Sequence, residues 1–107
     1  MQLTDSFQIS AQHPCLPGHF PNHPIVPGVV LLEQVEKLIQ QHLPDWAITE
    51  LNQAKFIETV LPEEQIEITV DTSKLAEKGS ITFQLLNLQT QNRVASGKAS
   101  LSQKQQD

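Results

Sequence analysis

The segment from residue 18 to residue 33 reads GHFPNHPIVPGVVLLE and gathers groups that could move protons. His19 is followed by three prolines, each of which fixes φ and removes a backbone donor, so the loop should be pre-organised. Gly28 then opens an apolar run. The first amides of a helix starting there would have no intrahelical acceptor and could stabilise negative charge developing on a carbonyl oxygen. With Glu33 five residues further on, the segment carries a base, an acid and an oxyanion site.

Composition bounds the classes of function that this chemistry could serve. The chain has 107 residues and a formal net charge of −5, which predicts one domain over residues 1–107 and argues against general nucleic-acid binding. The single cysteine, Cys15, cannot form an internal disulfide, so we expect a cytoplasmic protein. We expect no membrane span, because the longest apolar run is only Val29 to Leu32. Residues 103–107 are expected to be a flexible tail.

The hydrophobic pattern predicts an α+β domain. A short strand is expected at 7–11, a proline-rich loop up to residue 27 and a helix over about 29–42, ended by Pro44. Four period-two segments follow at 46–59, 65–72, 80–88 and 93–102. The apolar face expected for the helix consists of Val29, Leu31, Leu32, Val35, Leu38, Ile39 and Leu43.

The segment 18–33 resembles the active-site region of the 3-hydroxyacyl-[acyl carrier protein] dehydratases. Their signature reads Gly-His-Phe-Pro, two variable residues, Pro, two further residues, Pro-Gly-Val and a helix with an acid, and every fixed element is present here. The stretches Lys55-Phe56 and Val60-Leu61-Pro62 also resemble family elements, and residues 95–99 resemble its last strand. Lys37 replaces a common Gln, and the short N-terminus resembles the small dehydratases of aryl polyene pathways.

The resemblance implies a hot-dog fold, one long central helix wrapped by a curved antiparallel sheet of about five strands. It implies dehydration of a (3R)-hydroxyacyl thioester to the trans-2-enoyl thioester, in fatty acid or aryl polyene biosynthesis. The substrate would be carried on the phosphopantetheine of an acyl carrier protein. No further cofactor is expected, because the thioester itself is the electron sink. The expected assembly is a homodimer or a trimer of dimers, or a hetero-oligomer with a related subunit.

The resemblance also implies the role of each site residue. His19 would take the C2 proton, with the carbonyl of Ile25 orienting its ring, and the amide of Gly28 would bind the thioester oxygen. Glu33 from the other chain would protonate the departing C3 hydroxyl. The expected wall of the acyl tunnel consists of Phe20, Pro27 and Phe56.

Other interpretations stay open at the level of sequence. Without the signature, His19 would be a turn histidine and Glu33 a solvated helix residue. A metal site formed by His13, His19 and His23 is disfavoured, because the prolines prevent the helical spacing that such ligands need. A hot-dog thioesterase, or a non-catalytic partner of an active dehydratase, would share much of this pattern. Exposed lysines such as Lys55 or Lys98 could meet an acidic carrier protein.

Overall fold

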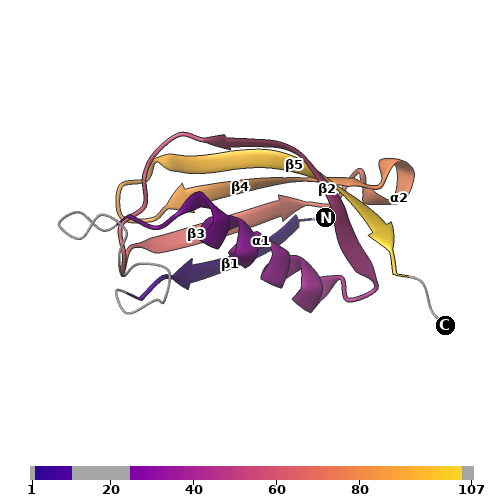
Figure 1. Cartoon of the computed structure of the whole chain (residues 1–107), viewed down its shortest axis with the longest axis horizontal. Coiled ribbons are helices and arrows are strands. Elements are labelled where there is room, and N and C mark those ends of the chain that lie inside the picture. The colour runs from indigo at the N-terminus through magenta and orange to yellow at the C-terminus, as the bar shows by residue number, and fades with distance from the viewer. Residues whose placement is uncertain (1, 11–24, 105–107) are drawn as a thin grey trace.

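The computed structural model describes residues 2–10 and 25–104. Its elements, in chain order, are β1 (Gln2–Gln8), α1 (Gly28–His42), β2 (Trp46–Phe56), β3 (Gln65–Asp71), α2 (Leu75–Lys78), β4 (Ser80–Asn87) and β5 (Arg93–Gln103). Figure 1 shows α1 lying along one side of the sheet, with the short α2 at the far end of the strands. Neither helix in the described part of the chain has the length and apolar character needed to cross a membrane.

The five strands form one antiparallel sheet in the order β1-β3-β4-β5-β2. Helix α1 contacts both edge strands, β1 and β2, so the sheet curls around it. This confirms the predicted hot-dog arrangement of one long helix wrapped by a curved sheet of five strands. Because β2 is an edge strand, no other described strand pairs with the outer side of its backbone.

The core lies between α1 and the concave face of the sheet. In β3 and β4 alternate residues are buried, which is the period-two pattern that predicted these strands. The buried members from α1, β3 and β4 are Val30, Leu31, Val35, Leu38, Ile39, Ile66, Ile68, Val70, Ile81, Phe83 and Leu85. In β5, a Cβ on Gly97 would overlap both the ring of Phe83 and the carbonyl oxygen of Gln53, so close packing requires glycine there.

The first strand differs from its prediction. It spans Gln2–Gln8 rather than 7–11, because pairing with β3, from Gln2 opposite Asp71 to Gln8 opposite Gln65, defines it rather than apolar alternation. Ile9 is buried but follows the strand. In the middle of the strand, the residues from Thr4 to Ser6 are exposed and polar, so this part of the sequence has no hydrophobic pattern that would predict a strand.

Four further details also differ from the prediction. Val29 was expected on the apolar face of the helix but is 61% exposed, because α1 buries the neighbouring Val30 and Leu31 instead. Strand β2 ends at Phe56, three residues earlier than expected, and α2 was not predicted. Gln103 was expected in a flexible tail but belongs to β5, where it pairs with Trp46, and the amide of Lys104 donates to the carbonyl oxygen of Asp45 at 2.7 Å.

Candidate active site

The first turn of α1 has backbone donors that remain available. Pro27 is the N-cap residue, with φ −61° and ψ 147°, and no side chain caps the helix. The carbonyl oxygen of Pro27 accepts hydrogen bonds from the amides of Val30 and Leu31, at 3.0 and 3.4 Å. The amides of Gly28 and Val29 therefore have no acceptor among the described residues. Such a terminus attracts an anion or a polarised carbonyl oxygen.

Gly28 lies in the wall of an apolar cavity of about 400 Å³ between the start of α1 and the end of β2. Its wall consists of Ile25, Val26, Pro27, Gly28, Leu31, Phe56, Glu58, Thr59 and Val60. A hydrogen bond of 2.8 Å from the amide of Val26 to the carbonyl oxygen of Val60 joins its two sides. The cavity thus offers apolar walls together with a few backbone donors, as small-molecule sites commonly do.

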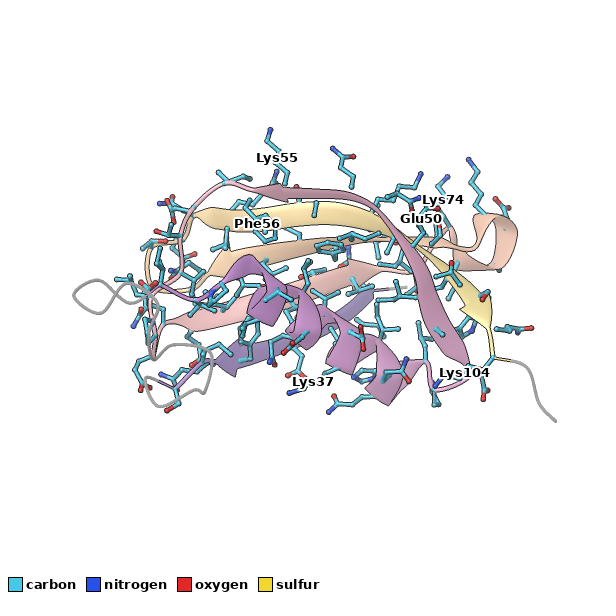
Figure 2. The ribbon with its side chains drawn as sticks, in the orientation of Figure 1. Lys37, Glu50, Lys55, Phe56, Lys74 and Lys104 are labelled. Atoms are coloured by element: carbon cyan, nitrogen blue, oxygen red, sulfur yellow. The ribbon has the colours of Figure 1, made fainter. Side chains whose placement is uncertain are left out.

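Phe56 determines which residue can occupy position 28. A Cβ on Gly28 would lie 2.9 Å from Cζ of Phe56 and 3.1 Å from Cε1, closer than real side chains approach. Figure 2 shows the labelled Phe56 beside the first turns of α1. Glycine at position 28 therefore allows the aromatic ring to lie against the start of the helix, next to the available amides.

Glu33 lies elsewhere on α1. It is exposed, and it lies five residues beyond Gly28, which is about 7.5 Å along the helix axis and about 140° around it. It is therefore not in the wall of the cavity beside Gly28. Within one chain, the acid and the helix-terminal amides do not face the same space.

The structure brings together four of the predicted site residues, Ile25, Pro27, Gly28 and Phe56, around one cavity. The predictions for His19 and Phe20 lie outside the described residues, as do those for His13, Cys15 and His23. No group of three His, Cys, Asp or Glu side chains that could hold a metal ion occurs within residues 2–10 and 25–104.

Two carboxylates near the helix were not singled out from the sequence. Glu58 lines the Gly28 cavity, and its Oε1 accepts a hydrogen bond of 3.1 Å from Nδ2 of Asn92. Glu36 borders a second, mainly apolar groove of about 200 Å³ between α1 and β2, with Leu32, Val35, Ile48, Leu51, Phe83 and Ala99. For Glu36 the only signal in the sequence was its position within the predicted helix. For Glu58 the one signal was its position two residues after Phe56.

The curated proteins with similar sequences include several 3-hydroxyacyl-[acyl-carrier-protein] dehydratases, whereas the similar solved structures also include an (R)-hydratase and an acyl-CoA thioesterase. The 3-hydroxyacyl-[acyl-carrier-protein] dehydratase FabZ of Pelotomaculum thermopropionicum is 35% identical over 75 residues, covering 63% of this chain and 54% of that protein. The chain thus spans about half the length of the curated relative. An uncharacterised protein from Erwinia carotovora subsp. atroseptica has a solved structure with a TM-score of 0.82 and 26% identity, over 95% of this chain and 83% of that one.

The dehydratase heterocomplex ApeI:P from Xenorhabdus doucetiae has a similar fold. Its matching chain superimposes with a TM-score of 0.83 at 22% identity, over 95% of this chain and 88% of that one. A model of the ApeI-like family, described as ApeI dehydratase, matches residues 2–98, nearly the whole chain. The chain therefore belongs to the ApeI-like dehydratase family.

Proposed function

We propose that this protein removes water from a 3-hydroxyacyl thioester to give the trans-2-enoyl thioester. The observation that carries the proposal is the amide of Gly28, which has no acceptor among the described residues and lies in the wall of an apolar cavity, in a chain of a dehydratase family. The thioester oxygen would accept from the Gly28 amide, which stabilises the charge that forms as C2 loses its proton. The cavity walls would hold the adjoining carbons of the acyl chain.

In the proposed reaction, proton transfer falls to His19 and Glu33. Neutral His19 takes the C2 proton, and protonated Glu33 gives a proton to the C3 hydroxyl, which leaves as water while the C2–C3 double bond forms. The carbonyl of Ile25 would hold the second ring nitrogen of His19. Pro27, Phe20 and Phe56 would form part of the tunnel wall. No redox partner is required, because the electron pair from the C2–H bond becomes the π bond.

The position of Glu33 supports a site shared between two subunits. Glu33 lies about 140° around the helix from Gly28, so its own chain does not direct it to the Gly28 cavity. A second subunit could supply it. The large apolar residues that remain exposed lie in or near the first turn of α1, in β2 and just after it, and β2 is an unpaired edge. They are Val29, Leu51, Phe56, Ile57 and Leu61.

We propose a homodimer joined along this surface, with a related subunit as the alternative partner. The alternative is supported by the Xenorhabdus doucetiae neighbour, which is a dehydratase heterocomplex. We further propose that the thioester is presented on the phosphopantetheine of an acyl carrier protein, as the name of the FabZ relative suggests. The resemblance to the small dehydratases of aryl polyene pathways makes an aryl polyene acyl group one candidate substrate, beside an ordinary fatty acyl group. A single cysteine fits a cytoplasmic location.

Purified protein with a 3-hydroxyacyl carrier protein tests the activity. We expect mass spectrometry to show loss of water from the acyl group with the thioester intact. Release of free thiol without water loss would instead identify a thioesterase. If the protein alone leaves the substrate unchanged but becomes active with a related subunit, the homodimer is wrong and the heterocomplex is supported.

Mixing two inactive variants tests the shared site. His19→Ala and Glu33→Gln should each abolish turnover while keeping the fold. If the site takes one residue from each subunit, random exchange in an equal mixture should restore about a quarter of the wild-type sites, because half the dimers are mixed and each has one intact site. An equal mixture that stays inactive after confirmed subunit exchange would contradict the shared site.

A further inference from the structure

A second cavity with a different chemistry lies at the α2 end of the sheet. It has a volume of about 270 Å³, and its wall consists of Asp71, Ser73, Lys74, Lys78, Ser80, Ile81, Thr82 and Lys98. Three of the seven Lys and Arg side chains of the protein therefore meet at one cavity, although the whole chain carries a net charge of −5. In Figure 2 the labelled Lys74 lies at the opposite end of the molecule from Phe56, so this cavity is separate from the candidate active site.

The three ammonium groups have no partner within the described residues. Neither a hydrogen bond nor an ion pair joins Lys74, Lys78 or Lys98 to any of them, whereas Nζ of Lys104 donates to Oε1 of Gln40 at 2.7 Å. Asp71 is the one carboxylate among the described residues of the cavity wall. Its Oδ1 accepts from the amide of Ser73 at 2.9 Å, which lowers its pKa, and the charge of Lys74 helps to lower this pKa without forming an ion pair. Three lysines and one carboxylate line the cavity, so positive charge remains in excess there, and a bound anion would reduce the repulsion between the lysines.

The register of the sheet explains why Asp71 does not neutralise Lys98. On the outer face, Asp71 of β3 lies opposite Thr82 of β4, and Thr82 lies opposite Lys98 of β5. Two strand spacings therefore separate Asp71 from Lys98, about 9.5 Å. Thr82, with its hydroxyl group, lies between the two side chains. A salt bridge from Asp71 to Lys98 would have to cross this position. Glu50 of β2 is not in the wall of this cavity and forms no ion pair with these lysines.

A polar groove continues from the basic cavity across the sheet. It has a volume of about 400 Å³ and shares Asp71, Thr82 and Lys98 with the cavity. The groove is bordered by uncharged donors and acceptors from all five strands, chiefly Gln2, Gln53, Thr69, Gln84 and Ser96. Together the two spaces offer positive charge at one end and amides and hydroxyls along the rest, within the size range of small-ligand sites.

We propose that this surface binds a phosphorylated small molecule, with the phosphate groups among Lys74, Lys78 and Lys98 and a polar body in the groove. The ammonium groups supply charge-assisted hydrogen bonds to phosphate oxygens, and the hydroxyls of Ser73, Ser80 and Thr82 can donate further ones. The groove side chains would hydrogen-bond sugar hydroxyls or a heterocycle. The proposal does not depend on the proposed dehydratase activity.

Calorimetric titration of the whole protein with ADP and with inorganic pyrophosphate tests this site. ADP should bind saturably, and more tightly than pyrophosphate, because only ADP reaches the groove. Binding should weaken as salt is raised from about 0.02 M to about 0.2 M. Lys98→Gln should weaken ADP binding by about fivefold to tenfold, since one charged contact is lost. The matched control is Lys55→Gln, which removes the same charge from β2 at a position outside both spaces.

Several results would overturn the proposal. No saturable binding of ADP or pyrophosphate would remove the site, and equal losses in Lys98→Gln and Lys55→Gln would reduce it to a general charge effect. Pyrophosphate binding as tightly as ADP would refute the role of the groove. Tight binding of poly-glutamate without binding of ADP would assign the lysines to an acidic protein instead. A substitution in the groove, Gln84→Ala, should weaken ADP but not pyrophosphate.

Discussion

Adding one methyl group at position 28 is the sharpest test of the candidate active site. Gly28→Ala keeps the backbone amide but places a Cβ about 2.9 Å from Cζ of Phe56. Overpacking of this kind costs roughly 1–3 kcal/mol, and the low end applies because the Phe56 side chain is 47% exposed and can turn away. The ring would then leave the cavity wall beside the helix amides.

The expected effect on activity follows from that displacement. A loss of about 1 kcal/mol of transition-state stabilisation lowers kcat/KM by about fivefold. Folding stability should not fall in parallel, because alanine is favoured over glycine in a helix by up to about 1 kcal/mol. These two contributions nearly cancel, so activity should fall while the free energy of unfolding stays almost unchanged, which separates this effect from simple unfolding.

A double-mutant cycle with Phe56→Ala identifies the cause. In that background the clash is absent, so Gly28→Ala should change kcat/KM by less than about twofold, which gives a coupling near 1 kcal/mol. The assay is carrier-protein dehydration followed by mass spectrometry, with urea unfolding of each variant as the stability measurement. Gln41→Ala, on the exposed surface at the other end of α1, serves as the control. An equal loss from Gly28→Ala in both backgrounds would refute the role given to the Phe56 ring.

Three further substitutions test the fold that supports the sites. Gly97→Ala should lower the free energy of unfolding by about 3 kcal/mol, measured by urea denaturation, because the new Cβ overlaps the ring of buried Phe83; no change would contradict the close packing. Asn87→Ala should cost about 1–3 kcal/mol in the same measurement, because buried Oδ1 accepts from two turn amides at 2.9 and 3.2 Å. The amide of Ser73 holds the pKa of Asp71 below its usual value, so its stabilisation is present at neutral pH and lost as pH falls through the folded-state pKa. Asp71→Asn should therefore flatten the fall of unfolding free energy below about pH 4, and an unchanged acid limb would contradict this.

The sequence predicted the elements whose burial repeats with a regular period. Strands β3 and β4 alternate buried and outward residues, and α1 places apolar residues at helical spacing, so these three were predicted, as were β2 and β5 with small differences at their ends. Strand β1 was misplaced because polar residues can occupy an edge strand held by its neighbour's backbone. The four-residue α2 is too short for a periodic signal. Packing and pairing, rather than local pattern, determine these two elements.

The candidate active site and the basic cavity also differ in how far the sequence could predict them. Ile25, Pro27 and Gly28 are adjacent in the chain, so a sequence signature could predict that they act together. Lys98 approaches Lys74 only through the antiparallel register of β4 and β5 and the turn that contains α2. No spacing along the sequence reveals that meeting. The basic cavity therefore became visible only when the sheet placed its strands side by side.

The spacing of Gly28 and Glu33 in the signature supports the proposed shared site. A carboxylate four or three residues after Gly28 would lie closer to the same helix face, whereas five residues place Glu33 about 140° away, on the exposed surface. This spacing does not suit a chain that uses the Gly28 amide and the Glu33 carboxylate at the same cavity. The same arrangement becomes productive when two helices face each other, because each exposed acid can then reach the other's cavity. The free edge of β2 and the exposed apolar side chains of Leu51 and Ile57 lie where such a pairing could form.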